Sequence, residues 1–260
     1  MSTPILTFFN QKGGVGKTTC SVSVAGALAK DGARVLFVDM DAQRSGTLML
    51  GAKRPEVTLF MALVTPQMAP FSGVLCETGN PRILCAPASR YSDEGDLREF
   101  CLRNPHALKN ALEGVANEFD FIVIDSPNHR SPAVAMSLLA ATCAVLVVKC
   151  EPLTMPAIED AAATIEQARA AGNNRLQVRA LINEYGKDAL SDEVSQTVSD
   201  AFPQTMLQTK VPTSKFLKKC LLYADSCGGS VVDFAPKSNP AARAFCALAG
   251  EFQIQFGGTK

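Results

Sequence analysis

The chain has 260 residues, of which 25 are basic and 25 acidic, so its formal net charge at pH 7 is zero. This balance argues against nucleic-acid binding through overall charge, and any such contact has to come from a local basic patch. The nine cysteines include no Cys-x-x-Cys pair and follow no cationic secretory leader, so we expect reduced cytosolic thiols and no zinc or iron–sulfur site.

The first element along the chain is an expected strand, Ile5 to Phe9, which runs into a glycine-rich segment at residues 10–19. That segment reads Asn-Gln-Lys-Gly-Gly-Val-Gly-Lys-Thr-Thr and has the pattern of a phosphate-binding loop. It departs from the common pattern twice, because Gln11 stands where the first glycine is usual and Lys12 adds a second lysine. Lys12 is interpreted either as a solvated loop side chain or as a lysine that crosses to the nucleotide of a second subunit.

The residues of this loop predict how a nucleotide is held. Glycines allow backbone dihedrals that turn successive N–H groups toward phosphate oxygens, and the expected helix from Lys17 to Lys30 adds its positive end. Lys17 would reach the β- and γ-phosphates, and the Thr18 hydroxyl would take a place on Mg²⁺. The expected nucleotide-binding residues of the loop are Gly13, Gly14, Val15, Gly16, Lys17, Thr18 and Thr19.

Downstream, apolar runs of strand length alternate with stretches of helical length. The expected strands are Val35 to Asp39, Ile83 to Ala86, Phe121 to Asp125, Ala144 to Val148, Val178 to Asn183 and Met206 to Val211. The expected helices include Ala107 to Asn117, Ala157 to Ala171 and Ser191 to Ala201. This alternation predicts an α/β fold of the P-loop NTPase type, with a mostly parallel twisted sheet and helices on both faces. We expect residues 1–260 to form a single domain.

One uncharged segment, Ser131 to Val148, touches the lower limit of length for a membrane span. Pro132 near its start, and the change from Ala/Leu-rich to Val-rich sequence near Cys143, favour a helix followed by a buried strand. We therefore expect no transmembrane helix in this segment.

Acidic residues end two of the expected strands, at the edge where ligands collect in parallel sheets. Asp125 ends the run Phe-Ile-Val-Ile-Asp, which suits it to hold Mg²⁺ directly or through water, and a helix N-cap before Pro127 is the alternative. Asp39 and Asp41 would project to the same side of the sheet in extended chain. We assign Asp41 to positioning or deprotonating an attacking water and Asp39 to supporting the metal and the loop, with a structural role for one of the two as the alternative.

Residues 12–19, the segment Asp39-Met40-Asp41-Ala42-Gln43 and the strand that ends at Asp125 together resemble the ParA/MinD family of deviant Walker-type ATPases. The C-terminal third, with Val211-Pro212-Thr213-Ser214 and Asp233-Phe234-Ala235-Pro236-Lys237-Ser238, resembles the ParA (Soj-like) branch, here without an N-terminal DNA-reading domain. Ala42 replaces a usual proline, and Asn128 replaces the second of two usual prolines. These departures make a more distant cargo-positioning relative credible.

The resemblance implies ATP and Mg²⁺ as cofactors. In this family ATP closes a sandwich homodimer, and the signature lysine, here Lys12, reaches the phosphates of the partner. The resemblance also implies that Asn183 lies near adenine, for which a strand-terminal turn residue is the alternative. The loop of Val211, Pro212 and Thr213 would cover the other side of the base. We expect slow ATP hydrolysis that a ParB-like or cargo-adaptor activator protein stimulates.

ParA-like members bind DNA without sequence preference as dimers, and this chain contains one dense basic cluster. Lys215, Lys218 and Lys219 are spaced to share one helical face, and Lys210 lies just before them. An ordinary solvated face is the alternative. Phosphate contacts would make the affinity strongly salt-dependent, and a dimer would double the patch. The expected protein is cytoplasmic and nucleoid-associated, and it positions a plasmid, a chromosome or a protein cargo.

Two other functions of the same fold stay open. MinD-like members bind the membrane surface through a basic amphipathic C-terminal helix. The last helix here has few charges and an apolar stripe of Phe245, Leu248, Ala249 and Phe252, so we expect it to dock on the core and to provide no stable membrane anchor. A metabolic or assembly-factor ATPase is the second alternative, and the lack of paired cysteines argues against its metal-cluster version.

Overall fold

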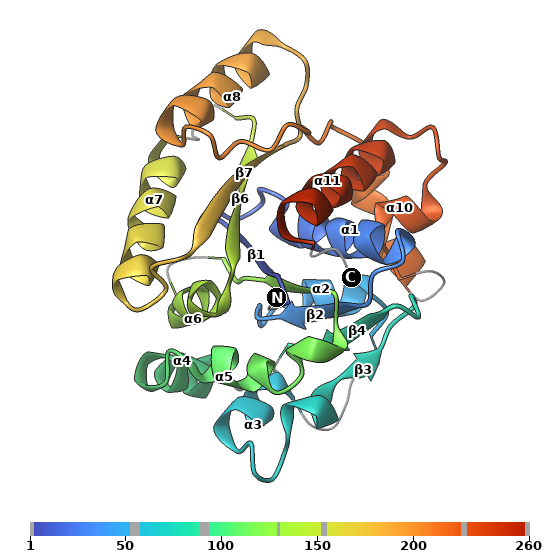
Figure 1. Ribbon diagram of the computed structural model, residues 1–260. Helices are drawn as coiled ribbons and strands as arrows, with labels where there is room; N and C mark the ends of the chain where they lie inside the picture. The colour runs from blue at the N-terminus through green and yellow to red at the C-terminus, as the bar shows by residue number, and fades with distance from the viewer. Residues whose placement is uncertain are drawn as a thin grey trace.

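The fold is built on one seven-stranded sheet with the strand order β3-β4-β2-β5-β1-β6-β7. A computed structural model describes residues 3–52, 58–88, 94–128, 131–151, 155–224 and 228–257 (Figure 1). Within this sheet the short strand β3 pairs antiparallel with β4, and the other pairs are parallel. The strands are β1 Ile5–Phe9, β2 Val35–Asp39, β3 Cys76–Glu77, β4 Ile83–Ala86, β5 Phe121–Asp125, β6 Cys143–Lys149 and β7 Gln177–Asn183.

Helices cover both faces of the sheet. Figure 1 shows α1, α10 and α11 together on one side and α3 to α8 on the other. The α-helices are α1 Lys17–Lys30, α2 Ser45–Met49, α3 Leu59–Val64, α4 Glu94–Arg103, α5 Ala107–Glu113, α6 Pro132–Ala140, α7 Met155–Ala170, α8 Ala189–Ala201, α10 Val231–Phe234 and α11 Pro240–Phe256. The 3-10 helices are η1 Phe71–Val74, η3 Ala116–Glu118 and η4 Leu217–Tyr223.

The sheet is buried on both faces because its strands are apolar at nearly every position. Phe37 of β2 packs into the core shared with α1 and α11, whereas its neighbours Leu36 and Val38 pack into the core shared with α3, α5 and α6. Such alternation is the normal consequence of the two-residue repeat of a strand. The expected α/β fold with a mostly parallel sheet is therefore confirmed.

One predicted strand is wrong. Within the part of the chain that the structure describes, residues 206–212 make only two isolated bridges, from Met206 to Ala180 and from Pro212 to Tyr185. Between these bridges the N–H groups of Gln208 and Thr209 donate to the carboxylate of Glu251, at 2.9 Å each. A side chain of α11 thus takes the hydrogen bonds that a neighbouring strand would need, and the ladder stops.

The end of the chain and the uncharged segment behave as predicted. Phe245, Leu248, Ala249 and Phe252 of α11 are all 0% exposed, which confirms that this stripe docks on the core. The uncharged residues 131–148 form α6 and most of the buried strand β6. Over the described residues, no helix is both long enough and apolar enough to span a bilayer.

Candidate functional site

The ends of three neighbouring strands bring the predicted site residues together. In the sheet register Asp125 of β5 lies opposite Asp39 of β2 and opposite Phe8 of β1. The glycine-rich loop begins directly after β1, at the same edge of the sheet. The carboxylates that sequence analysis assigns to a metal therefore lie beside the loop that it assigns to phosphates.

The loop opens onto free space and onto the start of α1. Gly14 and Gly16 have φ of 75° and 91°, a region that side chains disfavour. A Cβ added to Gly13 or Gly14 would meet no atom within 4 Å, so this stretch leaves room for a ligand. No side chain of the described residues caps the start of α1, and its first N–H groups are left for such a ligand. This geometry fits a bound phosphate.

Two buried asparagines hold the loop in place. Asn10 donates through Nδ2 to the Val147 carbonyl at 2.8 Å and accepts at Oδ1 from the Lys12 N–H at 2.9 Å. Asn183, at the end of β7, donates through Nδ2 to the Val15 carbonyl at 2.8 Å. Its buried Oδ1 accepts no hydrogen bond from the residues described. Asn183 is thus a clamp on the loop with one acceptor left over, and its predicted place near adenine stays a prediction.

Lys17 lies beneath the loop and is only 5% exposed. Its ammonium donates to the Asn128 side chain and, at 3.4 Å, to the carbonyl of Lys12. Burial lowers the pKa of Lys17, and the nearby Asp125 and Asp41 carboxylates act in the opposite direction. Asn128, which departs from the family pattern, is therefore part of the site, and sequence analysis assigned it no role.

Asp125 is fully buried, and neither of its carboxylate oxygens accepts a hydrogen bond of standard geometry from the described residues. Burial raises the pKa of Asp125 well above its usual value, Asp39 and Asp41 raise it further, and Thr18 and Lys17 lower it. A buried carboxyl beside a hydroxyl, with two unused oxygens, fits a hard cation such as Mg²⁺. The alternative of an N-cap is wrong, since α6 begins at Pro132 with Ser131 as its N-cap.

Asp39 and Asp41 have different environments. Asp39 accepts the N–H of Asp41 at 3.1 Å, the N–H of Thr47 at 2.7 Å and the Thr47 hydroxyl at 2.8 Å. Burial raises the pKa of Asp39 to about 6, although these hydrogen bonds oppose the shift. Strand β2 ends at Asp39, the Met40 N–H still donates to the Asp125 carbonyl at 3.0 Å, and the turn that follows runs from Asp41 to Arg44, so the common side predicted for Asp39 and Asp41 stays a prediction. Both oxygens of Asp39 thus brace the turn that presents Asp41.

Lys12 forms an ion pair with Glu151 of its own chain. Lys149 lies on the other side of Glu151, with Nζ 3.8 Å from a Glu151 oxygen and 3.4 Å from a Glu184 oxygen. The side chains of this charged row are 29 to 38% exposed, so solvent screens their interactions. Sequence analysis missed Glu151, because an acidic residue six positions before a predicted helix has no distinctive pattern.

The predicted base-covering loop lies beside the end of β7. Val211 is fully buried and donates its N–H to the Ile182 carbonyl, whereas Thr213 is exposed and donates through its hydroxyl to the Glu184 carbonyl. Pro212 bridges to Tyr185. The backbone of this loop therefore runs alongside the strand end that carries Asn183, and the side chain of Val211 belongs to the core.

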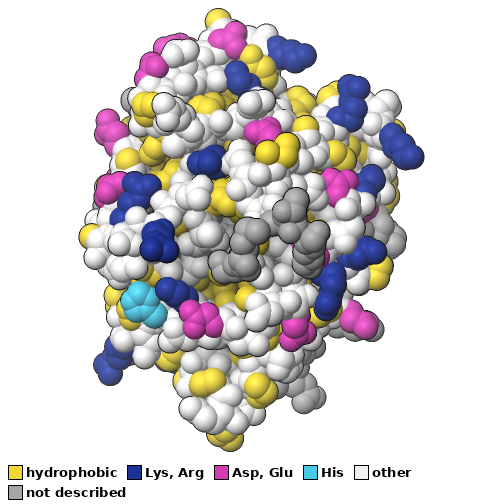
Figure 2. Space-filling model, viewed as in Figure 1, with side chains coloured by type: hydrophobic (Ala, Val, Ile, Leu, Met, Phe, Trp, Pro, Cys, Tyr) yellow, Lys and Arg dark blue, Asp and Glu magenta, His cyan; other side chains and the backbone are white. Residues whose placement is uncertain are grey.

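The predicted basic cluster is exposed, but it does not share one helical face. Lys215 lies in a turn, and Lys218 and Lys219 follow in the 3-10 helix η4. Lys210 is half-buried with Nζ 4.4 Å from the centre of the Tyr185 ring. Figure 2 shows Lys and Arg side chains along the right-hand edge of the molecule, where Figure 1 draws α10 and α11, with acidic side chains among them.

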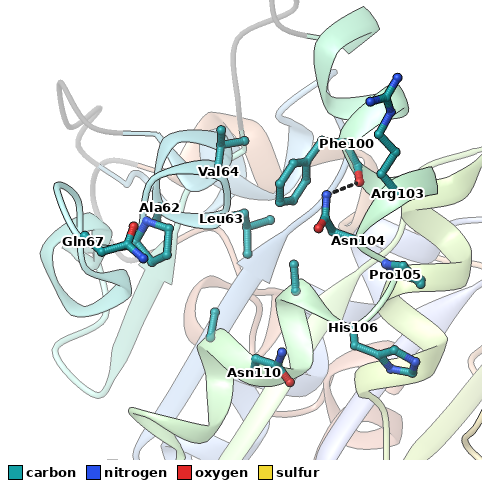
Figure 3. A pocket seen from close by; sticks show the side chains of 13 residues that line it. Ala62, Leu63, Val64, Gln67, Phe100, Arg103, Asn104, Pro105, His106 and Asn110 are labelled. Carbon is teal, nitrogen blue, oxygen red and sulfur yellow. Dashed lines mark hydrogen bonds between the residues drawn. The ribbon is translucent and has the colours of Figure 1, made fainter.

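A separate pocket of about 630 Å³ lies between α3 and the turn from α4 to α5. Figure 3 shows Leu63 and Phe100 facing each other in it, and Asn104 donating to the Phe100 carbonyl at 3.2 Å. None of the predicted site residues lines this pocket. The phosphate loop and the carboxylates therefore form the candidate site, at a different place in the molecule.

Comparison with known proteins gives matches over most of the chain. The family model AAA_31, described as an AAA domain, matches residues 3–178. The chain is 32% identical over 244 residues to the chromosome-partitioning ATPase Soj of Thermus thermophilus, and the match covers 93% of this chain and 92% of that protein.

Solved structures match over nearly the whole chain. Cobyrinic acid a,c-diamide synthase from Mycobacterium smegmatis, with bound ADP and magnesium, is 26% identical with a TM-score of 0.80, and covers 98% of this chain and 97% of that one. The ATP complex of a Cyanothece McdA variant has a TM-score of 0.84 at 17% identity and covers 100% of this chain and 99% of that one. At 17% identity the second match shows a shared fold alone.

Proposed function

The chain belongs to the AAA_31 family, within the ParA/MinD group of ATPases, and from that premise we propose that it is a ParA-like ATPase that positions a cargo. The observation that carries this proposal is the buried Asp125, whose oxygens accept no hydrogen bond of standard geometry from the described residues, beside Lys17, Thr18 and an open glycine loop. We also propose that residues 1–260 act as one ATPase domain, which the continuous sheet supports.

The chain's own residues suit ATP and Mg²⁺. The backbone of Gly13 to Thr19 and the Lys17 ammonium would bind the phosphates, while Thr18 and Asp125 would hold the metal. Asp39 would support this metal site through the turn that it braces. When bound, Mg²⁺ supplies charge neutralisation at the phosphates. Related structures with bound ADP and magnesium support this assignment.

Asp41 is the residue that would act on the attacking water. Its carboxylate is 8% exposed and is oriented by the Gln43 N–H, which donates to Oδ1 at 3.0 Å. The Asp41 carboxylate acts to raise the pKa of Lys17 against the larger effect of burial, which supports a position near the ammonium. A carboxylate so placed orients a water and accepts its proton. An activator that completes this arrangement would explain a slow basal rate.

The partner of the proposed protein is first of all a second copy of itself. Lys12 stands at the rim of the loop with its side chain 30% exposed, and it would reach the phosphates of the partner in an ATP-bound dimer. We expect the variant Lys12→Ala to remain monomeric with ATP, as measured by multi-angle light scattering. Lys149→Ala is the matched control, because Lys149 is equally exposed at 29% and contacts the same Glu151, and it should still dimerise. An ATP dimer of Lys12→Ala would refute the role across the interface.

In this proposal, Glu151 of the same chain competes with the phosphates bound to the partner subunit for the Lys12 ammonium. The variant Glu151→Gln keeps the shape of the side chain and removes its charge. Exposed ion pairs contribute about 0.2–1 kcal/mol each, so releasing one in each protomer should tighten ATP-dependent dimerisation roughly two- to thirtyfold. Sedimentation equilibrium with a non-hydrolysable ATP analogue measures this change. A weaker dimer would mean that Glu151 contributes to the interface instead of holding Lys12 back.

The proposed dimer binds DNA without sequence preference. The exposed lysines Lys215, Lys218 and Lys219 support this, with Lys210 nearby, although they span a turn and a 3-10 helix. A dimer would present the segment twice, so that binding follows the nucleotide state. An activator on the cargo would then release the protein from the nucleoid by stimulating hydrolysis.

A metabolic ATPase is the second candidate function, because the structural relative at 26% identity is named as cobyrinic acid a,c-diamide synthase. Under this alternative, ATP turnover would need no activator protein and would rise with a small carboxylic acid substrate. Steady-state turnover with cobyrinic acid, compared with turnover with duplex DNA, separates the two functions.

A further inference from the structure

A pair of cysteines faces each other at the edge of the sheet, outside the nucleotide site. Cys76 of β3 and Cys85 of β4 are directly opposite in the antiparallel register. Opposite residues of such a pair have Cα atoms about 4.5–5.5 Å apart and side chains on the same face. Those distances lie within the range of about 4.4–6.8 Å that a disulfide requires. Strand β3 is the last strand at one edge of the sheet (Figure 1).

The contacts place the Cys76 side chain against Cys85. Cys76 Sγ donates to the Cys85 carbonyl oxygen at 3.3 Å, and Cys76 packs on the core cluster that contains Cys85. Cys76 is half-buried, whereas Cys85 is 0% exposed. A reagent from solvent therefore meets Cys76 first and finds Cys85 directly behind it.

The two thiols also differ in pKa. A hydrogen bond from the Cys85 thiol lowers the pKa of Cys76, and the same bond, together with burial, raises the pKa of Cys85. Cys246, which is also half-buried, has its pKa raised by burial. A thiolate that is accessible and has a second thiol within reach is the usual arrangement of a redox-sensitive cysteine.

We propose that Cys76 and Cys85 are a redox-sensitive pair that forms a reversible disulfide between β3 and β4 when a peroxide is present. The Cys76 thiol gives up its proton and the thiolate attacks one oxygen of hydrogen peroxide. The O–O bond breaks, Cys76 becomes a sulfenic acid, and the leaving hydroxide takes up a proton to form one water. The Cys85 thiol then attacks the Cys76 sulfur, the S–O bond breaks, and a second water leaves. The peroxide is reduced and the two thiols are oxidised to one disulfide. A small dithiol reduces the disulfide and restores the two thiols.

Mass spectrometry tests this pair, because trypsin cleaves after Arg82 and separates the two cysteines. The reduced protein is exposed to hydrogen peroxide, its free thiols are alkylated under denaturing conditions, and it is digested. We expect the Cys76 and Cys85 peptides joined as one species, two hydrogen atoms lighter than their sum, which dithiothreitol separates. Maleimide should modify Cys76 faster than Cys246, because the pKa of Cys76 is lowered and that of Cys246 is raised.

Two variants make the test specific. Cys76→Ser should leave Cys85 reduced at the same peroxide exposure, and the matched control Cys246→Ser should form the joined peptides as the natural chain does. Circular dichroism checks that both variants fold. Full alkylation of Cys76 and Cys85 after peroxide treatment would overturn the proposal, as would a disulfide from Cys76 to any other cysteine.

Discussion

Replacing Lys17 with alanine is expected to weaken ATP binding by roughly 30- to 5000-fold, which corresponds to about 2–5 kcal/mol for removing one partner of a buried charge pair. The effect is large because the Lys17 ammonium is 5% exposed and lies where the phosphates would bind. Without it, Asp125 loses the nearby cation that lowers its pKa, and the carboxyl groups of Asp125, Asp39 and Asp41 that are ionised repel a bound triphosphate.

Isothermal titration calorimetry measures this loss directly. Lys30→Ala is the matched control, because Lys30 ends the same helix and donates to the Val232 carbonyl, away from the loop. The control should bind ATP as the natural chain does and should keep the rise in melting temperature that ATP produces. An unchanged dissociation constant for Lys17→Ala would remove Lys17 from the nucleotide site.

Asp41→Ala is expected to lower the rate of ATP hydrolysis by about 10²- to 10⁴-fold, the usual contribution of a positioned general base. ATP binding and ATP-dependent dimerisation should persist, because the metal and phosphate contacts are assigned to Asp125, Thr18 and Lys17. The turn itself should hold, since Asp39 receives its hydrogen bonds from the Asp41 backbone and from Thr47.

Single-turnover hydrolysis separates this prediction from a simple loss of binding. Asp31→Ala removes an exposed carboxylate at the end of α1 and should leave the rate unchanged. A variant Asp41→Ala that forms the dimer and still hydrolyses ATP at the natural rate would remove Asp41 from the catalytic role. Loss of ATP binding in this variant would instead assign Asp41 to the binding of nucleotide or metal.

The central strands could be predicted because each is a short apolar run that is typical of a buried strand. Strands β1, β2, β4 and β5 begin and end where the sequence predicts, β6 extends one residue further at each end, and β7 begins one residue earlier. The two-residue strand β3 has no such signal. Residues 206–211 look like a strand, yet Glu251, which is far away in sequence, takes their hydrogen bonds.

Helix ends were harder to predict, because single residues decide them. The helix predicted from Ala107 to Asn117 ends at Glu113, with Gly114 as its C-cap, and a separate 3-10 helix follows. Helix α8 begins at Ala189, two residues earlier than predicted, because the Asp188 side chain caps it by accepting the Ser191 N–H at 2.8 Å.

The candidate site also has residues that the sequence predicts and residues that it does not. The loop and the aspartates follow from a local motif and from strand ends, and the structure gathers them at one edge of the sheet. Asn128 and Glu151 could not be found, because their roles depend on contacts with Lys17 and Lys12 that cross long stretches of sequence. The face predicted for Lys215, Lys218 and Lys219 assumed an α-helix where the chain forms a turn and a 3-10 helix.

Binding to a random-sequence DNA duplex, measured with ATP and with ADP over a range of salt concentrations, tests the proposed function most directly. We expect the protein to bind the duplex with ATP and not with ADP. We also expect the logarithm of the affinity to fall linearly with the logarithm of the salt concentration, because lysines displace counterions from the phosphates. Absence of DNA binding in both nucleotide states, or equal binding in both, would contradict a ParA-like positioning ATPase.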